Sequence, residues 1–263
     1  MSSRKRKCRD DVKVGKSLPN SSDVIVNTVK SKYFKTDNAS SSGDAKTVKT
    51  SEKLGLSFYD KQCDVLAKHL LGKTLVRTLD SGERLSGVIV ETEAYLGRVD
   101  KAAHSYKGKT EKNEAMFMDP GTAYVYNIYG MYCCMNISSK GEGCAVLIRS
   151  LEPKEGIDIM EKERSKGKKD QTKKLKHKDF CNGPSKLCQS LHITKNAINK
   201  LDMTSSDKIW LEDNKTINDD MIVVSKRINI NYAEDWVDKP LRFYVLGNQC
   251  VSVKDKEAEK AFE

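Results

Sequence analysis

The feature that most restricts the fold of this chain is a run of 20 residues, 120–139, that carries no charged side chain. In the sequence as a whole, 32% of residues are Asp, Glu, Lys or Arg. The run reads PGTAYVYNIYGMYCCMNISS, and its aromatic and β-branched residues on both sides of Tyr129-Gly130-Met131 are typical of a β-hairpin. A membrane span of about 20 residues would be mostly aliphatic. Because this run holds proline, glycine, asparagine and four tyrosines, we expect a sheet element of a soluble protein.

The length of the hairpin loop decides which side chains of this run share a face. A two-residue loop would point Tyr126 and Asn136 to opposite faces. A three-residue loop, residues 129–131, would instead pair Tyr126 with Cys134. It would also pair Tyr124 with Asn136, so that all four side chains form an aromatic wall with one amide, suited to stacking a flat heterocycle. The alternative is that these alternating aromatic residues only fill a core.

Charge is distributed unevenly along the chain. Residues 1–54 contain 13 Lys and Arg against 6 Asp and Glu, so they carry +7 of the formal net charge of +10. This segment has few large apolar residues and cannot offset its chain entropy by burial, so we expect a disordered basic tail. Residues 55–263 have the length of one domain with a sizeable core. A basic chain is attracted to polyanions such as nucleic acid, although many basic proteins bind nothing acidic.

The cysteines indicate neither a disulfide framework nor a metal site. The eight cysteines include no CxxC pair, and no signal-type apolar segment opens the chain. We therefore expect reduced, buried thiols in an intracellular protein. Zinc ligation would need paired ligands at short spacing, so no metal is expected.

Periodicity and turn residues predict a mixture of helices and strands. Helices are expected at 59–71, at 152–163, and after Ser185, which is predicted to be an N-cap. Strands are expected, besides the hairpin, at 74–79, 85–95, 145–151, 222–224 and 241–245. The basic stretch 162–178 is typical of a solvated loop that would add contacts beside a nucleic acid. Helices and strands do not alternate regularly, which predicts an α+β fold: a single compact domain with a curved, mostly antiparallel sheet flanked by helices.

Two carboxylates follow the apolar strand residues 87–90. Glu91, Glu93 and Tyr95 lie at i, i+2 and i+4, which places them on one face of a strand. The plainer explanation is an exposed strand end with ordinary surface acids, because buried carboxylates are costly unless paired or used. Arg149 also ends an apolar strand and could keep one Glu ionised, as a general base acting on water requires. A buried salt bridge without a chemical role would look the same in the sequence.

Several motifs occur in order between residues 57 and 254. They are VETEAYLG (90–97), AAHS (102–105), MFM (116–118), PGT (120–122), YVY (124–126), IYGMY (128–132), MNIS (135–138), LEP (151–153) and GPSKLC (183–188). In this order they resemble the eukaryotic 3-methyladenine-DNA glycosylase (alkyladenine glycosylase) family. The resemblance implies one compact α+β domain, monofunctional removal of alkylated or deaminated purines from DNA, and no metal or organic cofactor.

The resemblance also implies roles for the residues that could do chemistry. Glu93 matches the general base that activates the attacking water, and Arg149 matches the residue that helps to hold this water. Glu91 matches no such role. Ile228 falls where the family uses a main-chain carbonyl near the water, although the residues around it match loosely.

The base pocket and the DNA contacts are implied in the same way. The pocket residues are Tyr95, Ala102, His104, Tyr126 and Asn136. The DNA-contact residues are Tyr129, Met131, Tyr132 and Lys186. A lone loop histidine such as His104 is more often a surface residue, but the resemblance makes it a wall against which the extruded base stacks. Asn136 would reject guanine by a clash with its exocyclic amine, and Tyr129 would fill the gap left in the helix.

Residues and resemblance together predict a base-excision-repair glycosylase that flips damaged purines out of duplex DNA and hydrolyses the N-glycosidic bond, leaving an abasic site. The implied partner is double-stranded DNA containing damaged purines, bound by a monomer away from membranes. A non-catalytic protein that shields lesions is a second hypothesis, disfavoured by the presence of both Glu93 and Arg149, and a basic RNA-binding module is a third. Repair of DNA and the cluster Arg4-Lys5-Arg6-Lys7 predict nuclear localisation, with mitochondrial import as the alternative.

Overall fold

A computed structural model describes residues 52–166 and 175–262 of the chain. Nearly all of the predicted tail 1–54, including the basic cluster at its start, lies outside the described residues, as do residues 167–174 of the basic stretch. The division into a tail and a domain therefore stays a prediction. No helix within the described ranges is long and apolar enough to cross a membrane.

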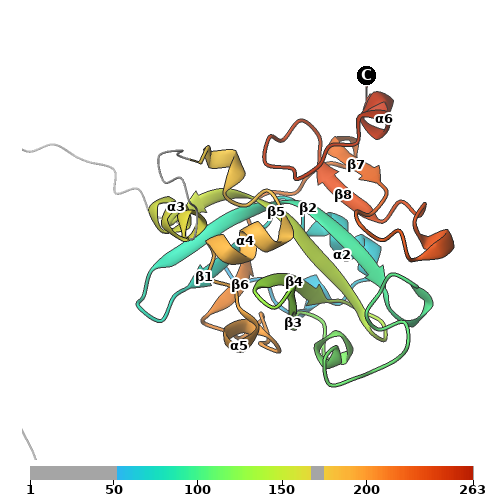
Figure 1. Cartoon of the computed structure of the whole chain (residues 1–263), viewed down its shortest axis with the longest axis horizontal. Coiled ribbons are helices and arrows are strands. Elements are labelled where there is room, and N and C mark those ends of the chain that lie inside the picture. Colours follow the sequence, from blue (N-terminus) through green and yellow to red (C-terminus); the bar gives the residue numbers. More distant parts are fainter. Residues whose placement is uncertain (1–51, 167–174, 263) are drawn as a thin grey trace, which may run out of the picture. The chain divides into compact units, whose positions relative to one another are not determined.

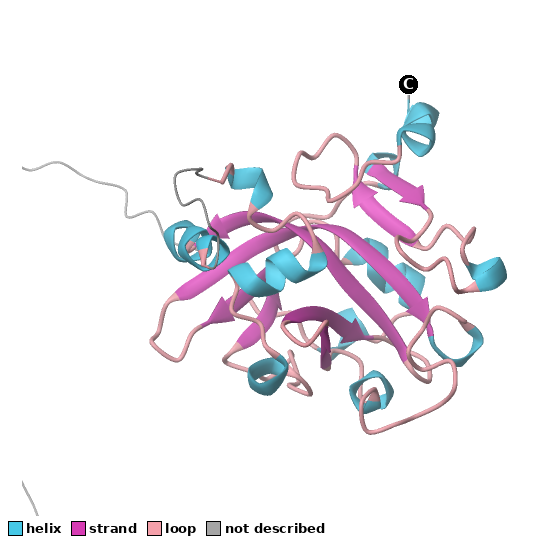
Figure 2. Ribbon diagram, in the orientation of Figure 1, coloured by secondary structure: helices cyan, strands magenta, loops and turns pink. Residues whose placement is uncertain are grey.

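The described residues form one eight-stranded sheet in which every strand pairing is antiparallel (Figures 1 and 2). Its strands are β1 (Thr74–Thr78), β2 (Arg84–Leu96), β3 (Ala123–Ile128), β4 (Tyr132–Ser138), β5 (Cys144–Glu155), β6 (Ile209–Glu212), β7 (Ile222–Ser225) and β8 (Arg242–Val245). The main path runs β3-β4-β5-β2-β1-β6, and β8 joins β2 to β7. The predicted α+β class with a mostly antiparallel sheet is confirmed.

The sheet forks at β2. The first part of this strand, residues 84–88, pairs with β1, whereas residues 91–93 pair with β8. Along its other edge β2 pairs with β5 over nearly its whole length, with register shifts on both sides of Glu91. Such irregularities re-aim side chains and are common next to active sites. The two carboxylates that the sequence places at a strand end therefore lie between β5 and β8, inside the sheet.

The helices are short and pack mainly against β2, β4 and β5 (Figure 1). Their bounds are α1 (Leu56–Tyr59), α2 (Cys63–His69), α3 (Ile157–Ser165), α4 (Pro184–Ser190), α5 (Lys195–Ile198) and α6 (Lys256–Glu259). Single 3₁₀ turns lie at 97–99, 114–117, 177–179, 219–221, 234–236 and 260–262. Thr92 Oγ1 on β2 donates to the Ala67 carbonyl of α2 at 2.8 Å. The helix α4 packs against β4 and β5 where these strands diverge, because they pair only at residues 136–138 and 145–147.

The alternation of side chains along β3, β4 and β5 separates the core from a cavity. One set of alternating residues is fully buried in the main core: Ala123, Val125, Met135, Ile137, Val146 and Ile148. The intervening set lines the cavity: Tyr124, Tyr126, Cys134, Asn136, Leu147 and Arg149. Because successive strand residues point to opposite faces, one sheet builds the hydrophobic core with one face and the candidate site with the other.

Two helix boundaries differ from the predictions. The predicted helix 59–71 is two helices, α1 and α2, because the chain between them leaves helical geometry and Gln62 forms a parallel bridge with Lys140. The predicted helix 152–163 begins only at Ile157. Residues 152–155 instead extend β5, where Glu155 pairs with Ser86 of β2. In both places tertiary pairing overrides local helical periodicity.

In the C-terminal half, one predicted N-cap is wrong and one strand was not predicted. Ser185 is not the N-cap of α4, because Gly183 holds that position and Pro184 opens the helix. Proline suits the first helical turn because its missing N–H has no intrahelical partner there. The strand β6 was not predicted; it pairs with β1 at the sheet edge.

Candidate active site

The hairpin β3–β4 has the three-residue loop that places its polar residues on one face. Tyr124 pairs with Asn136 and Tyr126 with Cys134, so the register expected for an odd-numbered loop is confirmed. Tyr129 and Gly130 in the loop have φ angles of 50° and 73°. The left-handed region is costly for most residues but not for glycine, and three-residue hairpin loops use it. The turn therefore lets both arms of the hairpin line the cavity.

The cavity behind this hairpin has a volume of about 260 Å³. All five predicted pocket residues line it: Tyr95, Ala102, His104, Tyr126 and Asn136. Arg149 and Pro184 contribute from β5 and α4, and residues 228–230 and Tyr232 contribute from the segment after β7. The volume is below the roughly 300–1,000 Å³ of pockets for drug-sized ligands, so the cavity suits one small, flat group.

The aromatic walls of the cavity contact one another closely. The ring centroids of His104 and Tyr126 are 4.5 Å apart with planes at 74°, and Tyr124 stacks on Tyr126 at 5.5 Å. His104 Nδ1 lies 2.9 Å from the Tyr124 hydroxyl. Burial lowers the pKa of His104 below its ordinary 6.5 and raises the pKa of Tyr124 to about 12. At neutral pH this wall is therefore uncharged, which favours stacking with a cationic ring over repelling it.

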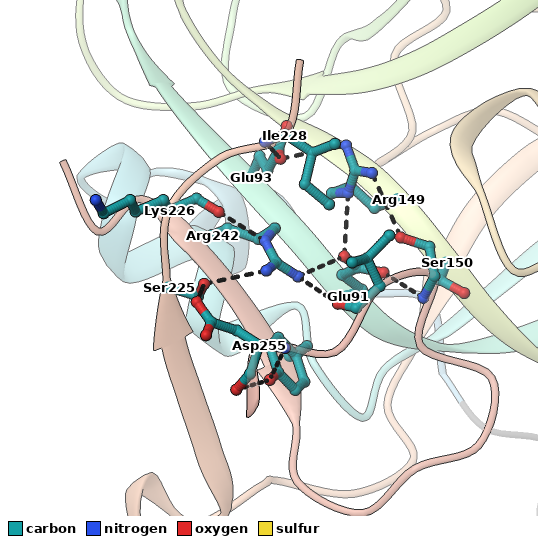
Figure 3. A network of polar contacts seen from close by, with 12 residues as sticks. Glu91, Glu93, Arg149, Ser150, Ser225, Lys226, Ile228, Arg242 and Asp255 are labelled. Atoms are coloured by element: carbon teal, nitrogen blue, oxygen red, sulfur yellow. Dashed lines mark hydrogen bonds and ion pairs between the residues drawn. The ribbon is translucent and has the colours of Figure 1, made fainter. Parts of the chain in front are cut away.

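Glu93 is fully buried behind the cavity. Its Oε1 accepts the Ile228 N–H at 2.7 Å and lies 3.2 Å from Arg149 Nη1, as Figure 3 shows. Its Oε2 accepts the Tyr95 hydroxyl at 2.9 Å. Burial, and then Glu93 itself, raise the pKa of Tyr95 well above its ordinary value, so this phenol keeps its proton and donates. Both carboxylate oxygens are thus held by donors that also line the cavity.

Arg149 joins Glu93 to Glu91 in a buried network (Figure 3). Glu91 is fully buried, and its Oε1 accepts from Arg149 Nε at 3.1 Å and from Arg242 Nη1 at 3.0 Å. Its Oε2 accepts the Ser252 N–H at 2.7 Å. Burial lowers the pKa of Arg149, but the attraction of Glu93 and Glu91 outweighs it, so the pKa is raised. Two carboxylates and two guanidinium groups compensate each other, and the explanation of Glu91 and Glu93 as exposed surface acids is wrong.

A second buried ion pair supports the pocket walls. Arg227 and Asp100 have fully buried side chains and make two contacts, at 2.6 Å and 2.9 Å. The Arg227 guanidinium lies over the Tyr95 ring at 4.7 Å, and Asp100 Oδ1 accepts the Ala102 N–H at 2.9 Å. The pair therefore holds two predicted pocket residues, Tyr95 and Ala102, in one arrangement. Asp100, Arg227, Arg242 and Ser252 carry no local signal in the sequence and were not predicted.

The predicted DNA-contact residues are exposed, and one of them, Tyr129, also lines the cavity. Tyr129 is 92% exposed, Met131 75% and Tyr132 44%, so the hairpin tip is an uncovered apolar projection. Lys186 is exposed on α4, where its Nζ donates to Asn182 Oδ1 at 2.8 Å. Within the described ranges, no group of three or more His, Cys, Asp or Glu side chains could hold a metal ion. The roles implied for the individual residues of the site stay predictions at this point.

Comparison with known proteins identifies the family of this chain. The family model of methylpurine-DNA glycosylase matches residues 57–249. The human DNA-3-methyladenine glycosylase is 48% identical over 211 residues, which cover 79% of this chain and 70% of the human protein. The mouse DNA-3-methyladenine glycosylase is 48% identical over 214 residues, covering 80% of this chain and 64% of the mouse protein. The chain thus belongs to the methylpurine-DNA glycosylase family and is a monofunctional DNA glycosylase of base excision repair, a hydrolase that acts on N-glycosyl bonds.

Proposed function

We propose that this glycosylase extrudes an alkylated or deaminated purine from duplex DNA, stacks it in the aromatic cavity, and hydrolyses its N-glycosidic bond with a water activated by Glu93. One observation carries the proposal: a fully buried carboxylate, held by three donors, lies directly behind a cavity sized for one flat group. Base chemistry on duplex DNA requires the nucleotide to leave the stack, because its reacting atoms are otherwise out of reach.

The extruded base would be held by stacking against the aromatic walls. Flipping costs a few kcal/mol and least for a damaged base. A purine nucleotide alkylated at N3 or N7 carries positive charge, and a desolvated cation against an aromatic face gains about 1 to 2 kcal/mol. The neutral state of His104 and Tyr124 leaves this attraction unopposed. The walls therefore favour a cationic base over an unmodified one.

The chemical step follows from the contacts of Glu93. The water oxygen attacks the sugar carbon C1′ while the bond from C1′ to the base nitrogen breaks, and its electron pair goes to the base. Glu93 takes the proton that the water loses, which is the function of a general base. A base that was cationic leaves as a neutral molecule and needs no added proton, whereas a neutral base such as hypoxanthine leaves as an anion and takes up one proton from water. Arg149 contacts Glu93 and lines the cavity, so it can hold the water beside the carboxylate.

Asn136 supports discrimination against normal guanine. It is buried in the cavity wall, and its Nδ2 donates to the Tyr124 carbonyl at 3.2 Å. This contact sets the orientation of the amide relative to the hairpin. A fixed side chain in the wall can clash with an exocyclic amine, whereas a mobile one would move aside. We infer that Asn136 excludes guanine in this way.

One assay separates this function from the other hypotheses. The full chain is incubated with DNA duplexes that contain a single hypoxanthine or ethenoadenine, and alkali then cuts any abasic site. We expect alkali-dependent cleavage at the lesion only. Tight lesion binding without cleavage would identify a lesion-shielding protein instead. Equal binding of modified and unmodified duplexes, again without cleavage, would contradict recognition of damaged purines.

Replacing Tyr129 with serine is expected to lower kcat/KM on a duplex substrate by about 10- to 100-fold, since stacking of one base on an aromatic side chain contributes roughly 1–3 kcal/mol. The effect on the same lesion in single-stranded DNA should be much smaller, because no gap needs filling there. Tyr129 is 92% exposed, so the melting temperature should not change. Val99→Ser, at a 66% exposed residue outside the cavity lining, is the matched control. An equal loss on both substrates would argue against a wedge.

We propose that the protein works in the nucleus as a monomer on duplex DNA containing damaged purines. The support is its DNA substrate class and the basic cluster Arg4-Lys5-Arg6-Lys7. Replacing these four residues with alanine in a fluorescent fusion should shift signal from the nucleus to the cytoplasm. Signal in mitochondria for the unaltered chain would favour the alternative of mitochondrial import.

A further inference from the structure

Tyr232 lines the cavity but has no part in the mechanism above. It is 68% exposed, and its hydroxyl donates to the Ala102 carbonyl at 3.3 Å. The contact joins the segment after β7 to the loop after β2. It places a phenol beside the base pocket, on a different segment from the hairpin tyrosines. Because ligand pockets are commonly lined by aromatic side chains, this phenol is a candidate ligand contact.

The backbone that carries Tyr232 is firmly held. Upstream, the Ile228 N–H is bound by Glu93 at 2.7 Å. Downstream, the Ala233 N–H donates to the Ile230 carbonyl at 2.9 Å, which closes a turn around Tyr232. Ile230 and Ala233 are buried in a small cluster that also contains Ala102. The position of the phenol is therefore tied to the catalytic carboxylate on one side and to the pocket wall on the other.

The contact of Tyr232 changes what Ala102 can offer a ligand. The Ala102 N–H is already occupied by Asp100 Oδ1 at 2.9 Å. Its carbonyl, which has two lone pairs, receives the Tyr232 hydroxyl on one of them. Burial raises the pKa of Tyr232, so at neutral pH this hydroxyl is protonated and remains a donor. The carbonyl of Ala102, a residue that lines the cavity, thus keeps one lone pair for another donor instead of two.

We propose that Tyr232 is a specificity-determining residue that limits how well the pocket binds purines with an exocyclic amino group, relative to purines with an exocyclic keto group. The inference rests on the proposed function. A free carbonyl lone pair accepts an amino N–H but repels a keto oxygen. The Tyr232 hydroxyl occupies one lone pair of the Ala102 carbonyl. It therefore reduces the preference of the pocket for amino purines over keto purines, and it broadens the range of lesions that the pocket accepts.

The test is Tyr232→Phe, which removes only the hydroxyl. Release of 3-methyladenine from methylated duplex DNA and release of hypoxanthine from a deaminated duplex are measured side by side. The ratio of the two kcat/KM values, amino over keto, is expected to rise about 3- to 10-fold, the effect of one hydrogen bond. Tyr106→Phe is the matched control, because Tyr106 is 41% exposed and lies outside the cavity lining, and its ratio should not change.

The ratio distinguishes specificity from a structural role, because a general defect lowers both rates together. A ratio that stays within twofold of the parent, or that falls, would overturn the proposal. Tyr232→Ala, which also removes the ring, should raise KM for both substrates in addition to shifting the ratio. A parent chain that releases neither base would overturn the glycosylase mechanism itself, whereas active parent and variant with equal ratios would overturn only the role of Tyr232.

Discussion

Glu93→Gln is expected to release damaged bases about 10²- to 10⁴-fold more slowly than the parent chain, the usual contribution of a positioned general base. Glutamine keeps the size of the side chain and can still accept the Ile228 N–H, which now bonds Glu93 at 2.7 Å. It cannot accept a proton from water at neutral pH. The reaction therefore loses its base while the cavity and the aromatic walls keep their shape.

The measurement is single-turnover base release with protein in excess, together with a gel-shift titration on the same duplex. Lesion binding should be retained, because the stacking residues do not change. Glu142→Gln is the control, since Glu142 makes an exposed 3.2 Å pair with Arg98 and does not line the cavity. If Glu93→Gln releases the base at the parent rate, another group activates the water and the assignment of Glu93 is wrong.

Glu91→Ala is expected to lower the free energy of unfolding by about 3–5 kcal/mol, the cost of removing one partner from a buried ion pair. Arg149 and Arg242 both donate to Glu91 Oε1, and their side chains are only 8% and 4% exposed. Alanine would leave Arg242 without the carboxylate that it contacts and the Ser252 N–H without its acceptor. Desolvated charges and donors that lose a partner are strongly destabilising.

Urea unfolding of the full chain measures this loss. Glu142→Ala removes an exposed carboxylate and should change stability by only about 0–1 kcal/mol. Glu91→Gln retains an oxygen that accepts hydrogen bonds, so its free energy of unfolding should lie between those of Glu91→Ala and Glu142→Ala. This variant also provides a measurement if Glu91→Ala does not fold. A Glu91→Ala chain that unfolds at the same urea concentration as Glu142→Ala would show that the network in Figure 3 does not stabilise the fold.

Local patterns were sufficient for the hairpin. The alternation of aromatic and small residues around Tyr129-Gly130-Met131 predicted the strands, but it left open whether the loop has two or three residues. Tyr126 and Cys134 then pair as a three-residue loop requires. The hairpin itself is visible in the sequence because its strands are close along the chain, whereas the structure decides the register. The pairing of Arg149 with a glutamate was also predicted, because both strand ends follow apolar residues, but only the family resemblance selected Glu93 over Glu91.

Local patterns were misleading where distant segments pair. Residues 152–155 resemble the start of a helix but continue β5, because Glu155 pairs with Ser86 of β2. Ser185 resembles an N-cap for a different reason, a local one: the N-cap of α4 is Gly183, two residues earlier, and Pro184 is the first helical residue. Energy gained from pairing with a strand elsewhere in the sheet exceeds the small preference of a short segment for a helix.

The sequence by itself determined the fold class, the hairpin, the aromatic pocket residues and the two acids beside an arginine. Only the tertiary structure decided that both acids are buried, because β8 closes the edge of β2 from more than a hundred residues away. It also brought Arg227, Ser252 and Tyr232 to the site, from segments without motifs. Strand alternation and turns depend on neighbouring residues, whereas burial and charge compensation depend on which distant segments fold against each other.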